Sequence, residues 1–212
     1  QTLEFARESG CKRFIFASSM SAYGDPEHFP TTEQEPLRPK SPYGANKAAG
    51  EMMARVYGAQ YGIEWTVFRL YTTYGASQNL ENLEQGLLSI YLAYLVKGEP
   101  IVVKGPLDRK RDIVHVSDVV DAMTRCVDNP RAIQKAYNMC TGISLSIREL
   151  LHELIQNFGK DPEKYPIIEQ GGTPGDPMVS FGSCESAKRD LGWEPKVSPF
   201  EGIRMTVKNL RS

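Results

Sequence analysis

Hydrophobic residues along this chain alternate between short apolar runs and longer stretches with helical spacing. Residues 13–17 and 64–69 have the length and composition of strands buried in a parallel sheet. Between them, Ser41 and Pro42 are typical of the first residues of a helix, and apolar positions continue at helical spacing to about Tyr61. This order of elements predicts parallel strands joined by a crossover helix.

The second half of the chain continues this alternation in shorter units. Ser146 and Glu149 have the spacing of a capping box, which predicts the start of a helix. Further strands are expected at residues 100–103, 112–116 and 136–139, and further helices at residues 1–9, 81–97, 117–128, 146–158 and from 198 to the end. The predicted fold class is therefore α/β, with a doubly wound parallel sheet.

Composition narrows the possible functions. The 212 residues are 41% hydrophobic and 24% charged, which is typical of a globular protein with a buried core. A net charge of −1 provides no overall attraction for nucleic acid or acidic membranes, so we expect neither as a partner. The four cysteines are widely spaced, and we expect reduced thiols, a cytoplasmic protein and no metal site. Glu51, Asp118 and Asp121 are expected to be capping or solvent-exposed carboxylates.

Tyr43 and Lys47 are the residues most indicative of chemistry. Near the start of the expected helix and four positions apart, their side chains project from one face, where an ammonium favours ionisation of a phenol. Such a phenol is a usable acid or base near neutral pH, and Ser18 or Ser19 can hydrogen-bond the same substrate oxygen. The spacing also occurs by chance on helix surfaces, so its interpretation depends on its surroundings.

The predicted topology supplies those surroundings. Ser18 and Ser19 end the first strand, Tyr71 and Thr72 follow the second, and Tyr43 lies at the loop-to-helix junction between them. In open parallel sheets, ligands bind at the carboxyl ends of the strands. We therefore expect these side chains to meet at one edge of the sheet, around a ligand.

Motifs in a fixed order cover nearly the whole chain. They are FIFASSMSAYG at residues 14–24, SPYGANK at 41–47, RLYTTYG at 69–75, RDIVHVSD at 111–118 and LGWEP at 191–195. This set resembles the extended short-chain dehydrogenase/reductase family, and within it the NAD-dependent nucleotide-sugar epimerases and dehydratases. The resemblance implies a Rossmann-like sheet, a smaller C-terminal α/β substrate domain, and NAD as the cofactor.

The resemblance also implies roles, carried over position by position. The implied catalytic residues are Ser19, Tyr43 (the acid/base) and Lys47. The implied cofactor-binding residues are Ser18, Ser19, Tyr43, Lys47 and Tyr71, and the implied substrate-binding residues are Thr72, Val103, Lys104, Arg111 and Asp176. Arg111 would clamp a nucleotide diphosphate, a task suited to a forked, permanently charged donor. A surface pair of Arg111 with Asp112 or Asp118 is the alternative.

The chain departs from the family pattern in several places. Thr72 stands where the family commonly has Asn, and Thr173 where it has a diphosphate-binding Arg, which weakens the implied phosphate clamp. Met20 and Ser21 replace the Asp-Glu pair of the 4,6-dehydratases, so dehydration is disfavoured. The glycine-rich loop that holds the cofactor pyrophosphate has no counterpart in the sequence. We therefore expect a fragment that lacks roughly a hundred N-terminal residues of βα units and binds NAD weakly by itself.

These inferences predict residues 1–78 as the C-terminal part of a dinucleotide-binding domain and residues 79–212 as mainly a substrate-binding domain, with 113–140 able to return to the main sheet. The predicted function is NAD-dependent epimerisation of a nucleotide-activated sugar through a transient 4-keto form, similar to the UDP-glucose 4-epimerases. The expected partners are a nucleotide sugar, with a UDP-hexose favoured, and a second copy of the chain in a homodimer. A UDP-uronate epimerase or decarboxylase and an inactive nucleotide-binding relative remain alternatives.

Overall fold

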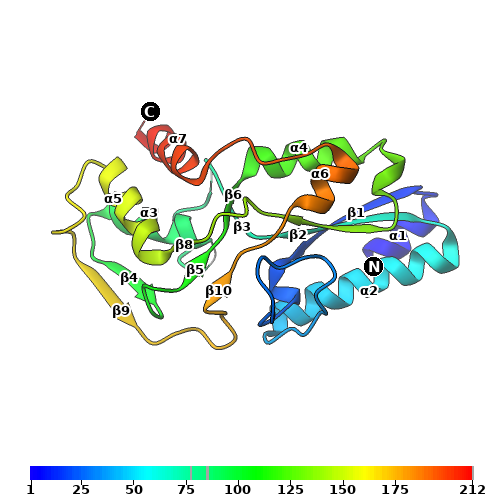
Figure 1. The fold of residues 1–212 in the computed structure, drawn as a ribbon, viewed down its shortest axis with the longest axis horizontal. Helices are drawn as coiled ribbons and strands as arrows, with labels where there is room; N and C mark the ends of the chain where they lie inside the picture. Colours follow the sequence, from blue (N-terminus) through cyan, green and yellow to red (C-terminus); the bar gives the residue numbers. More distant parts are fainter. Residues whose placement is uncertain (77, 85, 212) are drawn as a thin grey trace.

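The computed structural model describes residues 1–76, 78–84 and 86–211. The molecule is elongated, with a parallel sheet at one end and helices packed over short strand pairs at the other (Figure 1). The elements follow in the order α1 (Thr2–Glu8), β1 (Arg13–Ser19), η1 (Met20–Ala22), α2 (Pro42–Tyr61), β2 (Glu64–Leu70), β3 (Thr72–Tyr74), α3 (Leu87–Lys97), β4 (Ile101–Lys104), β5 (Lys110–Arg111), β6 (Ile113–His115), α4 (Val116–Cys126), η2 (Pro130–Ala132), β7 (Lys135–Met139), β8 (Leu145–Ser146), α5 (Ile147–Asn157), β9 (Ile167–Gln170), β10 (Val179–Ser180), α6 (Glu185–Leu191) and α7 (Pro199–Arg211).

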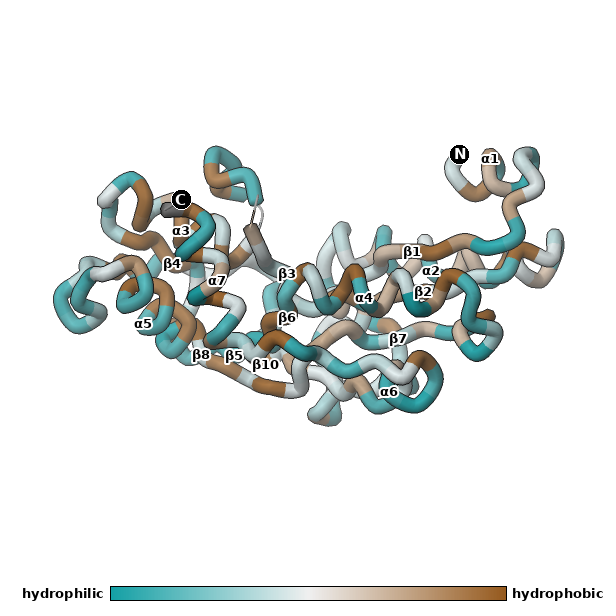
Figure 2. The backbone as a smooth tube through the Cα atoms, turned by 90° about the horizontal axis from the view of Figure 1, so that it is seen from above, coloured by the Kyte–Doolittle hydropathy of each residue, from teal (hydrophilic) through white to brown (hydrophobic). Residues whose placement is uncertain are grey.

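The main sheet consists of β1, β2 and β7, which are all parallel and lie in the order β1-β2-β7. α2 covers one face of this sheet, and α4 and α6 cover the other (Figure 1). Residues 65–69 of the central strand β2 are all buried, because helices cover both faces. β1 and β7 form the two edges of this sheet, as the view from above shows (Figure 2). The predicted α/β class with a parallel sheet is confirmed.

The other end of the molecule has a hydrophobic core of its own. It contains the parallel pairs β3-β6 and β4-β9 and the small sheet β10-β5-β8. α3, α5 and α7 supply most of the buried side chains of this core. β7 pairs with β2, so the chain does return to the main sheet within residues 113–140. In the part of the chain that the structure describes, no helix has both the length and the hydrophobicity that a membrane span requires.

Two expected boundaries differ in the structure. The helix expected over residues 81–97 begins only at Leu87, because Gly86 has a positive φ of 85° that does not continue a helix. Residues 81–84 are non-helical, and residue 85 lies outside the described residues. The strand expected over residues 112–116 ends at His115, because the His115 ring accepts a hydrogen bond from the Ser117 N–H and caps α4.

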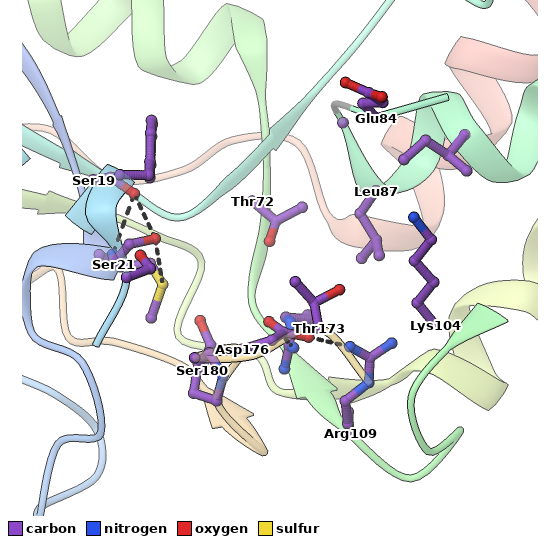
Figure 3. Close-up of a pocket in the computed structure, with 18 of the residues that line it drawn as sticks. Ser19, Ser21, Thr72, Glu84, Leu87, Lys104, Arg109, Thr173, Asp176 and Ser180 are labelled. Carbon is purple, nitrogen blue, oxygen red and sulfur yellow. Dashed lines mark hydrogen bonds and ion pairs between the residues drawn. The ribbon is translucent and has the colours of Figure 1, made fainter. Parts of the chain in front are cut away.

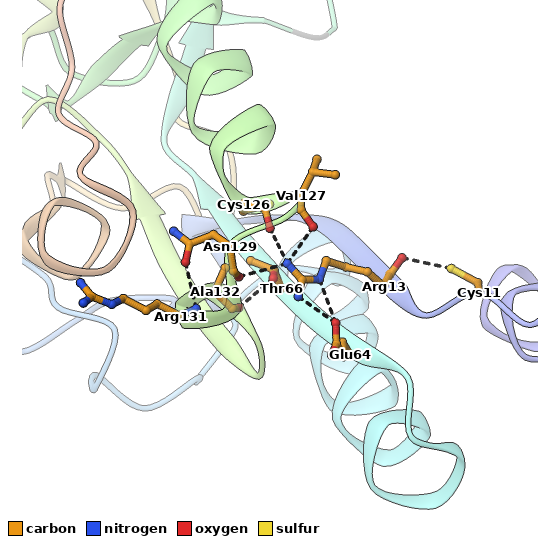
Figure 4. A network of polar contacts seen from close by, with 9 residues as sticks. All are labelled: Cys11, Arg13, Glu64, Thr66, Cys126, Val127, Asn129, Arg131 and Ala132. Atoms are coloured by element: carbon orange, nitrogen blue, oxygen red, sulfur yellow. Dashed lines mark hydrogen bonds and ion pairs between the residues drawn. The ribbon is translucent and has the colours of Figure 1, made fainter.

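Arg13, at the start of β1, links this strand to β2 and to the end of α4 (Figure 4). Its Nε and Nη2 donate to the Glu64 carboxylate on β2, at 3.1 and 2.7 Å. Its Nη1 donates to the carbonyl oxygens of Cys126, Val127 and Asn129, at 2.6 to 3.1 Å. These carbonyls lie at or just beyond the end of α4, where intrahelical donors are absent and the helix dipole favours a cation. All three nitrogens of Arg13 therefore have acceptors within the protein.

Arg69 on β2 and Glu51 on α2 form a buried ion pair between the main sheet and this helix. Their side chains are 2% and 0% exposed. Arg69 Nε and Nη2 donate to both carboxylate oxygens, and Nη1 donates to the Tyr23 hydroxyl at 2.9 Å. Burial by itself would lower the pKa of Arg69, but the bonds to Glu51 and Tyr23 raise it above its usual value. The expectation of a capping or solvent-exposed Glu51 is wrong, because the face of α2 that carries Glu51 packs on the sheet.

Candidate functional site

A cavity of about 750 Å³ lies at the carboxyl edge of the main sheet, between this sheet and the core of the other end. Its walls come from the end of β1, the start of α2, β3, α3, β4, β5 and the segment 173–180 (Figure 3). Of the residues predicted for the site, the cavity brings together Ser19, Tyr43, Tyr71, Thr72, Lys104, Arg111 and Asp176. The convergence expected from the topology is present, because β1 and β2 end at the same edge.

Tyr43 enters this cavity from the first turn of α2. Ser41 caps the helix by accepting a hydrogen bond from the Gly44 N–H at 3.1 Å, and Pro42 occupies the first helical position. A Cβ on Gly44 would lie only 2.3 Å from the Ser21 carbonyl oxygen. The absence of a side chain at Gly44 therefore allows the serine segment after β1 to pack against the turn that carries Tyr43.

Ser19 and Ser18 are separated by the pleat of β1. Ser19 lines the cavity, and its Oγ accepts a hydrogen bond from the Ser21 N–H at 3.2 Å (Figure 3). Ser18 points to the opposite face, where its hydroxyl donates to Glu51 at 2.5 Å, and it does not line the cavity. Of the two serines, only Ser19 lines the cavity together with Tyr43.

Lys47 lies one helical turn after Tyr43, outside the cavity wall. Its Nζ is 5.5 Å from the centroid of the Tyr43 ring and 5.4 Å from that of Phe16. The same nitrogen donates to the Ala17 carbonyl at 2.8 Å. An ammonium has three N–H donors, so this arrangement leaves donors for a ligand beside Tyr43.

Tyr71 and Thr72 form the wall of the cavity nearest the sheet. Tyr71 is 4% exposed, and burial raises the pKa of its hydroxyl well above the usual value. Tyr71 therefore stays neutral under physiological conditions. Thr72 belongs to β3 and is partly exposed in the cavity (Figure 3).

Asp176 lies away from Ser19 and Ser21 (Figure 3), and Arg111 pairs with it in the cavity wall. Arg111 Nη2 donates to Asp176 Oδ1 at 2.7 Å, so its carboxylate partner is neither Asp112 nor Asp118. Lys104 is exposed at the cavity rim. Val103 is fully buried in the core beneath, and its neighbour Val102 lines the cavity instead, because successive residues of β4 point to opposite faces.

Arg109 lines the same wall and was not among the predicted residues. Its guanidinium pairs with Asp176, beside Thr173 (Figure 3). The sequence does carry a signal for it: Arg109 and Arg111 are two positions apart in an extended segment, a spacing that puts both side chains on one face. Tyr91 on α3 also lines this wall.

Asp112 holds the loops beneath the cavity together. Its carboxylate accepts hydrogen bonds from the Thr141 N–H and hydroxyl, both at 2.7 Å, and from the N–H groups of Gly142 and Gly182. Burial raises the pKa of this carboxyl to about 6, although the hydrogen bonds from Thr141 and the two glycines act in the opposite direction. Asp112 therefore has a structural task next to the site.

Family membership agrees with this geometry. Residues 1–140 match the model of the NAD dependent epimerase/dehydratase family, and the chain belongs to this family. The predicted family is confirmed, as is NAD as the cofactor of the family.

Individual relatives carry several related activities. The chain is 34% identical to the UDP-glucose 4-epimerase of Mycolicibacterium smegmatis, over 99% of this chain and 66% of that protein. It is 30% identical to a dTDP-glucose 4,6-dehydratase of Streptomyces griseus, over 97% of this chain and 60% of that protein. The crystal structure of Thermotoga maritima UDP-glucose 4-epimerase with UDP-glucose matches with a TM-score of 0.91 at 34% identity, over 99% of this chain and 66% of that one. The chain thus spans at most about two thirds of these relatives.

Proposed function

We propose that the protein containing this chain is an NAD-dependent epimerase that inverts the 4-hydroxyl of a UDP-hexose. The observation that carries the proposal is the arrangement of the cavity. Ser19 lies far from Lys104 and from Asp176, the partner of Arg111 (Figure 3), and Tyr43 lines the same cavity. A nucleotide sugar has this same division, with an uncharged reacting sugar at one end and an anionic diphosphate and base at the other.

The residues around Tyr43 suit a nicotinamide cofactor. Lys47 contacts the Ala17 carbonyl and two aromatic rings, and forms no ion pair within the described chain, so its remaining N–H donors can bind ribose hydroxyls. Bound NAD would accept a hydride from the sugar carbon and would then return the hydride to the opposite face of that carbon. We propose that residues 1–78 and the returning β7 belong to the cofactor domain, and that most of residues 79–212 bind the substrate.

The chain's own residues would handle the proton and the sugar. Tyr43 exchanges a proton with the sugar 4-hydroxyl, and its 56% exposure leaves the phenol open to substrate. The Ser19 hydroxyl, which lines the same cavity, hydrogen-bonds the substrate oxygen in both its hydroxyl and keto forms. A cavity of about 750 Å³ has room for a hexose ring to turn over while the diphosphate stays bound.

The cavity wall favours epimerisation over dehydration. Elimination of water across a sugar needs a general acid and a base close to the ring. Met20 and Ser21 follow Ser19 at this end of the cavity, and the carboxylates in the described lining are Glu84 and Asp176, both away from Ser19 (Figure 3). Neither lies where an acid/base pair beside the ring would have to be.

We propose that the assembled protein is a homodimer. Met52, Met53 and Val56 are exposed on α2, a helix whose other face already packs on the sheet. Apolar side chains gathered on one helix face are typical of contacts between subunits. Sedimentation velocity on the full-length protein tests this proposal, and a single species with the mass of one chain contradicts it.

The function itself is tested by supplying candidate substrates to the full-length protein with NAD. We expect interconversion of UDP-glucose and UDP-galactose with no net NADH formation. In parallel, UDP-glucuronate tests the uronate alternatives through release of carbon dioxide or formation of its 4-epimer. If the protein converts UDP-glucuronate but neither UDP-hexose, the substrate is a UDP-uronate and the proposed UDP-hexose is wrong.

A further inference from the structure

Two arginines at the cavity wall share one carboxylate. Arg109 Nη1 pairs with Asp176 Oδ2, and Arg111 Nη2 pairs with Asp176 Oδ1. Both arginine side chains are only 7% exposed, whereas the Asp176 side chain is 30% exposed. The bridging carboxylate therefore holds the two guanidiniums next to each other at the surface of the cavity (Figure 3).

This cluster has an excess of positive charge. Asp176 neutralises one of the two guanidiniums. The rest of the described cavity lining adds one cation, Lys104, and one carboxylate, Glu84, so one positive charge remains. The neighbouring Tyr91 supplies no negative charge, because burial raises the pKa of its hydroxyl to about 12 even though Arg109 and Arg111 lower it. An unneutralised cation in a nearly buried position is costly, and an anion in the cavity removes that cost.

The fold fixes Arg109 in place before any ligand binds. Its Nε donates to the Pro106 carbonyl at 3.1 Å, and its own backbone carbonyl accepts from the Ile147 N–H at the start of α5. Gly105 has a φ of 96°, and a Cβ there would lie 3.1 Å from the guanidinium carbon. The absence of a side chain at Gly105 therefore gives the guanidinium its space, and little ordering is left for binding.

We propose that Arg109 binds the diphosphate of the nucleotide sugar jointly with Arg111. A diphosphate offers several anionic oxygens, and two adjacent forked donors match it better than one. A guanidinium has five N–H donors, and the bonds to Asp176, Pro106, the Tyr91 hydroxyl and the Lys110 carbonyl leave N–H groups of both arginines for a ligand. This inference rests on the proposed function for the identity of the ligand, and it adds Arg109 as a binding residue.

Binding of UDP and of uridine to the full-length holoenzyme separates the diphosphate from the rest of the ligand. Calorimetric titrations compare the wild type with Arg109→Gln, Arg109→Lys and the control Arg148→Gln, which changes an exposed arginine on α5 away from the cavity. We expect Arg109→Gln to weaken UDP binding by about 10- to 100-fold and to leave uridine binding within about twofold. Arg109→Lys keeps the charge and should lose about three- to tenfold. Arg148→Gln should match the wild type.

The outcomes are distinct. If Arg109→Gln folds and retains the wild-type ratio of UDP to uridine affinity, Arg109 is a structural residue and the inference is overturned. If Arg109→Gln does not fold, Arg109→Lys decides, and an unchanged ratio in that variant overturns it. A wild type that binds UDP no better than uridine also overturns it. A fourth outcome separates the two proposals. If Arg109→Gln loses the preference for UDP over uridine but the wild type has no epimerase activity, the role of Arg109 is supported and the proposed function is refuted.

Discussion

Arg69 and Arg111 are both buried and both paired with a carboxylate, but their surroundings differ. Among the described residues, Arg69 is the one cation that pairs with Glu51, and its third nitrogen donates to the Tyr23 hydroxyl. Arg111 shares Asp176 with a second arginine at the wall of a cavity. Arginines whose donors are all satisfied within the protein stabilise the fold, whereas arginines with surplus charge beside a cavity are available to a ligand.

The largest effect expected from this comparison concerns stability at the main sheet. Glu51→Gln leaves Arg69 buried without a counter-charge, and we expect a loss of about 3–5 kcal/mol in the free energy of unfolding. Urea denaturation of the full-length protein measures it. Glu27→Gln is the control, because Glu27 pairs with Arg38 on the surface at 65% exposure of both side chains. Equal effects of the two substitutions would mean that the buried pair has no special role.

Asp112 is a buried carboxylate whose hydrogen-bond partners are N–H and hydroxyl donors, whereas Glu51 and Asp176 are paired with arginines. Its pKa of about 6 exceeds the ordinary aspartate value of 3.8, so its contribution to stability is greatest below pH 4 and is lost as pH rises through 6. We expect the stability of the wild type relative to Asp112→Asn to fall by up to about 3 kcal/mol between pH 4 and pH 7. Urea denaturation across this range measures the difference.

The opposite slope, with the wild type gaining on Asp112→Asn as pH rises, would refute this account. It would mean that the hydrogen bonds from Thr141, Gly142 and Gly182 outweigh burial and lower the pKa of Asp112. A carbon-13 titration of the carboxyl group gives the midpoint independently.

A smaller effect is expected at the cavity. Arg111→Lys removes a forked donor remote from the reacting sugar carbon, so we expect the apparent KM for the nucleotide sugar to rise about tenfold while kcat changes less than about threefold. Steady-state kinetics on the full-length protein measures both. Arg148→Lys, on an exposed face of α5, serves as the control. An unchanged KM for Arg111→Lys would assign Arg111 to the structural class with Arg69.

The sequence predicts the main sheet well because its strands are apolar runs and its central helix has an explicit cap at Ser41. The convergence of Ser19, Tyr43 and Tyr71 follows from topology, since strands that run parallel end at the same edge. The role of Glu51 does not follow, because a glutamate on a helix is normally exposed and only the packing of α2 places it opposite Arg69. Arg109 was missed for a similar reason: its partner Asp176 is 67 positions away.

The start of α3 shows another limit of sequence reasoning. Residues 81–84 have helix-compatible side chains, so the expected helix extends back to residue 81. In the structure, Gly86 ends the preceding segment with a positive φ, and Leu83 and Glu84 line the cavity instead. Helix propensity alone does not predict that a segment forms part of a cavity wall instead of a helix.

The turnover of Tyr43→Phe tests the central claim, that one cavity joins a proton-transfer end to a diphosphate-binding end. The substitution removes one oxygen from an exposed ring, so the fold and the affinity for UDP should stay within about twofold of the wild type. We predict that kcat for interconversion of UDP-glucose and UDP-galactose falls at least about a hundredfold. Turnover close to the wild-type rate in a folded Tyr43→Phe protein would contradict the assignment of the proton-transfer end to Tyr43.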